Sequence, residues 1–323
     1  VAIAVFAGAS FACALATDIW TFLFFRMLQG GVITGYVLSL AIVRDTTSER
    51  EAASLIGYIS MAMAIAPMLG PMLGGLLDAA FGWRTTFYVY ALCGLVLCLV
   101  CWWDLGETRP TTPATQTPNL TRTRDLLTQP LFWAFSLCGT FSTGAFYMFL
   151  AGAPLVAQSQ FGMTPAALGV FIGSITVGFV AGAFIAGRLA ARNRPTTMMM
   201  AGRLIACCGL GLGIALIWAG HASPLVFFGS TIFVGLGNGI TMPSSNAAAM
   251  SVRADLTGSA AGINGALIVA GGAVLTSVTG AALSDHNPAL TLLILMLAAS
   301  AAGLASVLWA IYLQGKRVGA PVD

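Results

Sequence analysis

Residues 66–75 read Ala-Pro-Met-Leu-Gly-Pro-Met-Leu-Gly-Gly and lie within an apolar run of the chain. Small side chains recur every fourth residue here, at Ala62, Ala66, Gly70 and Gly74. On a helix this spacing forms one smooth stripe, along which another transmembrane backbone can approach closely, while the two prolines remove helix donors and bend the helix. We therefore expect a bent transmembrane helix that forms a sliding interface between two rigid halves, with static packing as the alternative interpretation. The predicted hinge residues are Ala66, Pro67, Gly70, Pro71, Gly74 and Gly75.

The rest of the chain has the composition of a polytopic membrane protein. Of its 323 residues, 58% are hydrophobic and 8% are charged, and the mean hydropathy is +0.90. A soluble chain carries about 25% charged residues, and a disordered chain needs low hydrophobicity, so both classes are excluded. The apolar runs are about twenty residues long, which favours helices over the roughly ten-residue strands of a barrel. The sequence thus predicts an all-α membrane bundle.

The apolar runs predict ten membrane spans. They cover about residues 1–17, 20–43, 53–77, 85–103, 131–157, 166–187, 197–219, 224–250, 257–282 and 289–313. The breaks between them fall where charged and turn-forming residues cluster. We expect an N-terminal bundle over residues 1–104, a cytoplasmic linker rich in Thr, Pro and Arg over 105–130, a C-terminal bundle over 131–315 and a cytoplasmic tail over 316–323.

Basic residues favour one side of these predicted spans. Of the 14 lysines and arginines, all but two fall on the side that we assign to the cytoplasm, Arg203 among them. The exceptions are Arg84, on the opposite side, and Arg26, the only charge predicted deep within a span. Cytoplasmic loops carry such an excess of positive charge. We therefore expect a protein of the bacterial inner membrane with a cytoplasmic C-terminus.

Two parts of the chain resemble each other. Val43-Arg44-Asp45 ends the second span, Val252-Arg253-Ala254-Asp255 ends the eighth, and a helix rich in small residues follows each. Transporters are often built from such parallel repeats, and pairing these segments leaves the first half two spans short. We expect two pseudo-symmetric bundles, the first lacking two helices, in a chain that represents the C-terminal part of a twelve-helix protein.

These motifs resemble the major facilitator superfamily. The stretch with two prolines is similar to its antiporter signature, Arg26-Met27-Leu28-Gln29-Gly30 to its Arg-x-x-Gln-Gly motif, and Gly82-Trp83-Arg84 to the segment before its sixth helix. The resemblance is strongest to drug:proton antiporters of the bicyclomycin and chloramphenicol resistance branch. It implies alternating access, proton-driven export of a small amphipathic compound, and a role in proton coupling for Arg26, Gln29 and Gly30.

Arg26 lies six residues after Trp20, a residue type that anchors helices at the membrane interface. At a rise of about 1.5 Å per residue this places it roughly 9 Å along the helix. A charge inside the membrane costs at least about 2.5 kcal/mol on insertion scales, so it should face a partner or water. Its own span holds no carboxylate, and we expect the partner in helices that precede residue 1. A structural hydrogen-bond hub is the alternative role.

Polar and aromatic side chains inside the spans are the candidate substrate contacts, because an amphipathic ligand needs aromatic surface and a few polar groups. They are Tyr36, Tyr58, Phe146, Tyr147, Asn238, Asn246 and Asn264. For each of them, ordinary helix packing is the alternative. The run Met198-Met199-Met200 is expected to face lipid. Two further rows of small residues suit either a moving interface or static packing; they are Ser174-Gly178-Gly182-Ala186 and Gly258-Gly262-Ala266-Ala270.

Enzymatic and metal-binding motifs are missing from the sequence. His221 and His286 fall in predicted outer loops without a metal-ligand motif, and the seven cysteines lie within apolar runs. Neither a nucleotide-binding loop nor a catalytic motif occurs. We therefore expect no metal, cofactor, nucleic acid or enzymatic activity, and a monomer that handles a small molecule and protons in the bilayer. Two alternatives remain open: a sugar or amino acid transporter of the same fold, and a non-transporting or inactive truncated membrane protein.

Overall fold

The computed structural model describes residues 1–46, 59, 70, 73–104, 106, 120–189, 192–253, 256–283 and 287–318. Every regular element within these ranges is a helix, and seven helices are long and apolar enough to cross a membrane. This confirms the predicted all-α membrane bundle. The contacts of the chain fall into two compact units, Val1–Thr117 and Pro118–Asp323. Most of the predicted span over residues 53–77 lies outside the described residues.

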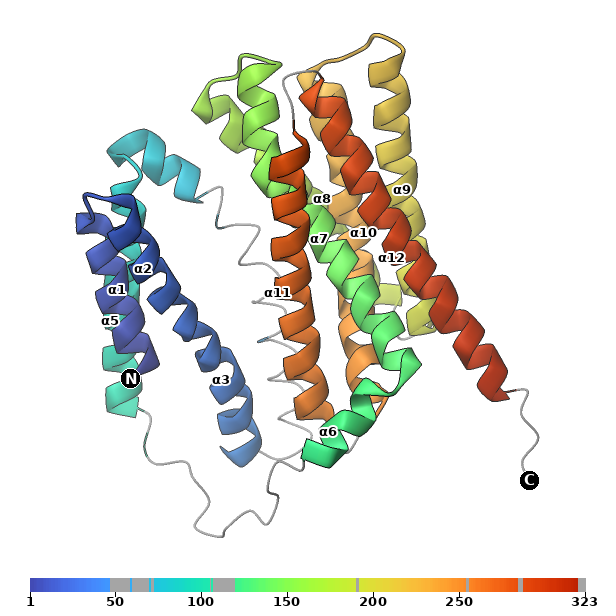
Figure 1. Ribbon diagram of the computed structural model, residues 1–323, viewed down its shortest axis with the longest axis horizontal. Helices are drawn as coiled ribbons and strands as arrows, with labels where there is room; N and C mark the ends of the chain where they lie inside the picture. The colour runs from blue at the N-terminus through green and yellow to red at the C-terminus, as the bar shows by residue number, and fades with distance from the viewer. Residues whose placement is uncertain are drawn as a thin grey trace. The chain divides into compact units, whose positions relative to one another are not determined.

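The first unit is built on the antiparallel helices α1 (Ala2–Leu15) and α5 (Arg84–Asp104), with α2 (Ile19–Gln29) packed against α1. A 3-10 turn, η1 (Gly30–Val32), leads from α2 into α3 (Ile33–Thr46) (Figure 1). The predicted second span is therefore two α-helices joined at the double glycine. The core of this unit is aromatic: Phe22 makes edge-to-face contacts with Trp83 and Phe87, a favoured arrangement of aromatic rings.

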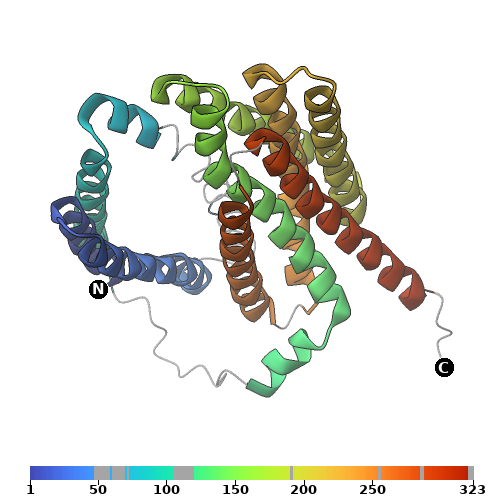
Figure 2. The same cartoon turned by 45° about the horizontal axis from the view of Figure 1, so that its top comes forward.

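The second unit contains one short helix and six long ones. They are α6 (Leu120–Leu127), α7 (Pro130–Ser159), α8 (Pro165–Leu189), α9 (Pro195–Trp218), α10 (Pro224–Ser251), α11 (Thr257–Ala282) and α12 (Pro288–Val318). Five of the long helices begin with proline, which suits the first helical position because its missing N–H has no intrahelical partner there. α10 packs against α8 and α9, while α7 packs against α11 and α12 (Figures 1 and 2).

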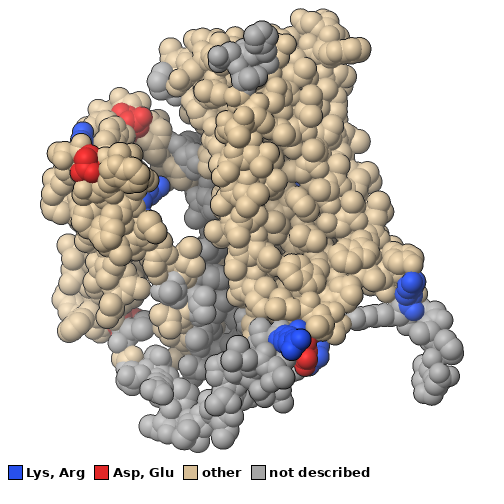
Figure 3. Space-filling model, in the orientation of Figure 1, with Lys and Arg blue, Asp and Glu red and all other residues tan. Residues whose placement is uncertain are grey.

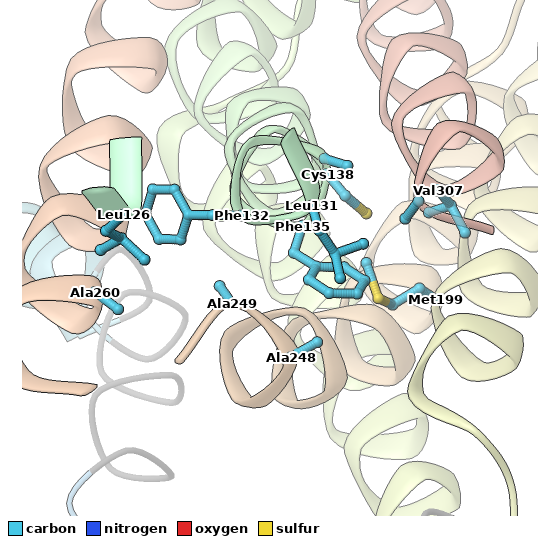
Figure 4. Packing of buried hydrophobic residues seen from close by; sticks show 12 residues of the cluster. Leu126, Leu131, Phe132, Phe135, Cys138, Met199, Ala248, Ala249, Ala260 and Val307 are labelled. Carbon is cyan, nitrogen blue, oxygen red and sulfur yellow. The ribbon is translucent and has the colours of Figure 1, made fainter. Parts of the chain in front are cut away.

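The core of this unit gathers side chains from α6, α7, α9, α10, α11 and α12. Figure 4 shows Phe135 and Cys138 of α7 close to Met199 of α9. The expectation that the methionine run faces lipid is wrong, because Met198 is 4% exposed and Met199 is 0% exposed. The buried face of α9 continues along the helix through Arg203, Ala206 and Leu210, and the methionines begin that face.

The row from Ser174 to Ala186 packs against α10 within this unit. An added Cβ at Gly178 or Gly182 would collide with backbone carbonyls of α10, and one at Gly235 or Gly239 would collide with α8. The two backbones therefore touch through glycine on both sides, as close-packed membrane helices do. The row on α11 is different, since Gly262 meets nothing within 4 Å and Ala266 and Ala270 are exposed.

In the second unit, the exposed charged side chains that the structure describes lie near one end of the long helices. Short connections make α8, α10 and α12 run in the same direction. Basic residues lie at or just beyond the C-terminal ends of these helices, or on α6; those whose side chains the structure describes are Arg124, Arg188, Arg192, Arg194, Arg253 and Lys316. Figure 3 shows the visible flank of this unit without exposed charge. The core of the unit holds one further basic residue, Arg203.

Candidate functional site

Arg26 is held by a chain of hydrogen bonds that runs from α2 to α1. Its Nη1 donates to Oε1 of Gln29 over 3.1 Å, and Nε2 of Gln29 donates to Oγ of Ser10 over 2.7 Å. Ser10 Oγ donates in turn to the carbonyl oxygen of Phe6 over 2.7 Å. The guanidinium also lies 5.5 Å from the ring centroid of Phe87 on α5, within the range of a cation–π contact. The Arg-x-x-Gln motif thus joins three helices.

The residues of this hydrogen-bonded chain differ in their exposure. Gln29 is 5% exposed and Ser10 is 0% exposed, whereas Arg26 is exposed. Among the described residues, no carboxylate lies within ion-pair distance of Arg26. Gly30 starts the 3-10 turn, and no atom in the described part of the chain lies within 4 Å of the position that a Cβ would take there. The buried amide of Gln29 therefore fixes the direction of the exposed guanidinium of Arg26.

Arg84 closes the C-terminal end of α1. Its Nε donates to the carbonyl oxygen of Ala14 over 3.1 Å and its Nη2 to that of Ala16 over 3.3 Å. The guanidinium also lies 4.6 Å from the ring centroid of Trp83. The last carbonyls of a helix have no intrahelical partner, and a cation near them is favourable. Gly82 supplies the turn before α5 with a φ of 85°, which a residue with a Cβ rarely adopts.

Asp18 lies in the turn that follows α1 and caps α2. Its Oδ1 accepts a hydrogen bond from the backbone N–H of Thr21 over 2.9 Å. Hydrogen bonds from the side chain and the backbone of Thr21 lower the pKa of Asp18, because they favour the ionised carboxylate. The turn between α1 and α2 is thus fixed by an acidic cap on one helix and a basic cap on the other.

Two of the predicted substrate contacts are neighbours on α7. The rings of Phe146 and Tyr147 lie 5.9 Å apart between centroids. Phe146 is buried and Tyr147 is half-buried. Gly272 of α11 lies against the ring of Tyr147, so closely that an added Cβ would collide with it.

Two asparagines form a pair between α10 and α11. Nδ2 of Asn264 donates to Oδ1 of Asn246 over 3.0 Å. Asn264 is 5% exposed, and its Oδ1 has no hydrogen-bond partner among the described residues. Asn238 does not join this pair, because it lies in a separate network with Arg203.

Several predicted site residues lie outside the described residues. They are Tyr58, Ala66, Pro67 and Pro71, together with the side chain of Tyr36. The structure places Gly70, Gly74 and Gly75 in helical conformation, with Gly74 half-buried and the other two exposed. The assignment of the hinge therefore stays a prediction.

A buried arginine on α9 corrects the sequence interpretation. Arg203 is 0% exposed, so Arg26 is not the only charge deep within a span. Its Nε donates to Oγ1 of Thr241 over 3.2 Å, its Nη2 donates to Oδ1 of Asn238, and its Nη1 has no partner among the described residues. The sequence analysis assigns Arg203 to the cytoplasmic side. Instead, its side chain turns into the bundle beside Gly303 of α12.

A model of the Major Facilitator Superfamily matches residues 1–276. The chain belongs to the major facilitator superfamily. The resemblance inferred from the motifs is thereby confirmed, and the protein is a membrane transporter and not an enzyme. Members of this superfamily move small molecules across membranes.

Named relatives of this transporter occur in several bacteria. It is 28% identical over 287 residues to an uncharacterized MFS-type transporter, YdgK, of Bacillus subtilis, which covers 87% of this chain and 71% of YdgK. It is 29% identical over 265 residues to the multidrug resistance protein MdtL of Citrobacter koseri, which covers 80% of this chain and 66% of MdtL. MdtL of Shigella dysenteriae serotype 1 is also 29% identical, over 270 residues. The chain therefore spans about two thirds of the length of these relatives.

A solved structure shares the fold of this transporter. It is the crystal structure of a bacterial homolog to the human lysosomal transporter Spinster, in an inward-facing and occupied conformation. The TM-score is 0.64 at 15% sequence identity, and the match covers 96% of this chain and 80% of the other.

Proposed function

We propose that this transporter exports small amphipathic compounds in exchange for protons, by alternating access between two bundles. The observation that carries the proposal is the hydrogen-bonded chain from Arg26 through Gln29 to Ser10. It holds an exposed cation in a fixed direction within a largely apolar helix pair. The names of the MdtL relatives support a drug as the cargo.

Arg26 is proposed to control the affinity for the proton. A guanidinium favours the ionised form of a carboxyl group within about 4–6 Å. When a carboxylate that faces Arg26 takes up a proton, its attraction to Arg26 is lost, and the helices that carry the two groups are free to separate. When the bundles return, Arg26 favours release of the proton. Removal of Arg26 would leave the carboxyl group protonated through the whole cycle and so uncouple export from the gradient.

The proposed cargo contacts come from three helices of the second unit. α7 supplies the rings of Phe146 and Tyr147, and α10 and α11 supply the pair of Asn246 and Asn264. Among the described residues, the buried Oδ1 of Asn264 has no hydrogen-bond partner. Aromatic surface with few polar groups suits an amphipathic molecule, and a sugar would need more hydrogen-bonding groups than these.

The remaining assignments complete the proposal. The hinge from Ala66 to Gly75 forms the sliding contact, and the bundles extend over residues 1–104 and 131–315.

The basic ends of α8, α10 and α12 support a cytoplasmic C-terminus in the bacterial inner membrane. A fluorescent-protein fusion at the C-terminus should therefore be bright, and an alkaline-phosphatase fusion at the same site should be inactive. The opposite pair of results would reverse the orientation.

Export is tested in bacteria that lack their own drug exporters and express the full-length gene product. Cells preloaded with ethidium should lose it faster than cells with an empty vector, and a protonophore should abolish the difference. Ethidium loss that a protonophore leaves unchanged would contradict proton coupling. Uptake of labelled sugars or amino acids without any drug export would favour the metabolite transporter, and no transport of either class would favour a non-transporting protein.

A further inference from the structure

One face of α10 carries three buried polar side chains, Asn238, Thr241 and Ser245, which we call the polar seam. Nδ2 of Asn238 donates to the carbonyl oxygen of Ser142 on α7 over 3.0 Å. Oγ of Ser245 donates to the carbonyl oxygen of Phe135, also on α7, over 2.8 Å. The two donors are seven residues apart on α10, and the two acceptors are seven residues apart on α7. The polar seam therefore ties α10 to α7 at two levels, about two turns apart.

Arg203 joins α9 to the same polar seam. Its Nε donates to Oγ1 of Thr241 over 3.2 Å, and its Nη2 donates to Oδ1 of Asn238. Gly303 of α12 leaves room for the stem of Arg203, because an added Cβ there would stand 3.2 Å from Cδ. The guanidinium thus bridges two positions of the polar seam that lie one turn apart on α10.

The contact of α10 with α8 is of a different kind. An added Cβ at Gly235 or Gly239 of α10, or at Gly178 or Gly182 of α8, would collide with the backbone of the other helix. The glycines recur every fourth residue on both helices, so a slip of α10 by four residues would again place glycine opposite glycine. This close contact therefore does little to select one register of α10 on α8.

The polar seam opposes such a slip. A slip by four residues would bring Val234 or Met242 to the place of Asn238, depending on its direction. Either side chain would leave the fully buried guanidinium of Arg203 without the acceptor of its Nη2. A buried charge that loses its partner is strongly destabilising, so the charge penalises the shifted registers.

Net stability is a weaker reason for an arginine at this place. Among the described residues, Arg203 has neutral acceptors only, and its Nη1 has no partner. Replacing a buried ion by an apolar side chain of similar volume is often neutral or stabilising. A polar group that is satisfied in one register acts instead against the other registers, as a single buried polar residue does in a coiled coil.

We propose that Arg203 and the polar seam form a register lock, which keeps α10 from sliding along α8 and lets the second unit move as one body. The proposal concerns this unit alone and holds for any cargo. The register lock restricts the positions that α10 can adopt, and it adds little to the free energy of unfolding.

The test measures the position of α10 along α9 in the full-length protein in detergent. Non-natural amino acids carry spin labels at Thr197 of α9 and Leu225 of α10, which are exposed and lie near opposite ends of the two helices. Pulsed dipolar EPR of the otherwise wild-type protein should give one narrow distance distribution. Arg203→Met/Asn238→Leu removes the charge and its acceptor together. It should add a second distance shifted by about 5 Å, one helical turn, while its unfolding midpoint stays near the wild-type value.

Two variants in the Arg203→Met background form a matched control. Ser245→Ala removes a buried hydroxyl that bonds to α7, whereas Ser230→Ala removes a buried hydroxyl that bonds to the carbonyl oxygen of Phe227 on α10 itself. The first should broaden the distribution beyond that of Arg203→Met, and the second should not.

A folded Arg203→Met/Asn238→Leu protein with the wild-type distance distribution would overturn the register lock, whatever its unfolding midpoint. If that protein does not fold, the matched pair decides. Equal distributions for Arg203→Met/Ser245→Ala and Arg203→Met/Ser230→Ala would then overturn the proposal, and broadening confined to the Ser245→Ala variant would support it.

Discussion

Arg26 and Arg203 both stand in apolar helices and both donate to a side-chain amide, yet the structure uses them differently. Arg26 bonds to Gln29, three residues further along the same helical stretch, and its guanidinium is exposed within the first unit. Arg203 bonds to Asn238 on a different helix and is fully buried. An exposed cation in a fixed direction suits a partner that comes and goes. A buried cation with permanent acceptors suits a rigid body.

Glycine accounts for the difference between the two environments. Gly202 and Gly237 bring α9 and α10 into backbone contact beside Arg203, so an added Cβ on either would collide with the other helix. Beside Arg26, no atom of the described residues lies within 4 Å of the position that a Cβ would take at Gly30 or Gly31. Whether an arginine is buried or exposed therefore depends less on its depth in the span than on how closely the neighbouring helix backbone approaches.

The largest expected effect comes from breaking that backbone contact. Gly237→Ala places a Cβ against the carbonyl oxygen of Gly202 and within 3.0 Å of the Cβ of Ala206. We expect a loss of about 3 kcal/mol in the free energy of unfolding, because the backbones must move apart. The matched change in the first unit, Gly30→Ala, should be neutral or slightly stabilising. Thermal unfolding of the two purified variants measures both, and equal midpoints would refute the role given to glycine.

A smaller effect should follow from removing each amide partner. Asn238→Leu leaves a buried guanidinium without an acceptor and should lose about 2–3 kcal/mol in the free energy of unfolding. Gln29→Leu leaves Arg26 solvated and should lose about 1 kcal/mol. Thermal unfolding of the two purified variants shows which substitution lowers the stability more. If Gln29→Leu were the more destabilising, Arg26 would be the structural residue of the two, and the comparison would have to be reversed.

Only part of this comparison could be predicted from the sequence. Apolar runs and family motifs were sufficient for the all-α bundle and the superfamily, because a helix in a membrane satisfies its own backbone and needs no tertiary information. The motifs also singled out Arg26 and Gln29. The burial of Arg203 and Met199 was missed, because it depends on which face of α9 meets α10. A usable signal was present, since Arg203 stands as far into its predicted span as Arg26 does into its own.

The grouping of polar residues was also beyond the sequence. Asn238, Asn246 and Asn264 look alike in their apolar runs, but the structure pairs the last two and assigns Asn238 to Arg203. Eight residues separate Asn238 from Asn246 on α10, which leaves them about a quarter turn apart around the helix. Which neighbouring helix each side chain meets depends on the register with α7, α9 and α11.

Arg84 allows a third comparison, in which the expected loss of stability is smaller. Arg84→Met removes two bonds to the last carbonyls of α1. We expect a loss of about 1 kcal/mol in the free energy of unfolding, typical of a helix cap. Arg124→Met, exposed on α6, is the control with no such bonds among the described residues. Unchanged unfolding of Arg84→Met would mean that Trp83 and Phe87 hold the end of α1 without the cap.

The smallest effect is a dependence on pH. Bonds from Thr21 lower the pKa of Asp18 below its unfolded value, so the capping carboxylate adds stability that is fully present above the unfolded pKa. That stability is lost as the pH falls through the lowered, folded-state pKa. Asp18→Asn should therefore flatten the acid limb of the unfolding midpoint against pH, measured from neutral pH downward. An acid limb identical to that of the wild type would show that Asp18 contributes nothing to it.

Drug-induced proton release from energised inverted membrane vesicles is the decisive measurement for the exporter. The full-length protein should release protons from the vesicle lumen when ethidium is added, and Arg26→Ala should abolish that release while its unfolding midpoint stays near the wild-type value. Arg26→Lys, which keeps the charge, should retain part of the release. Full proton release by Arg26→Ala would contradict the role of the exposed arginine and, with it, the proposed coupling mechanism.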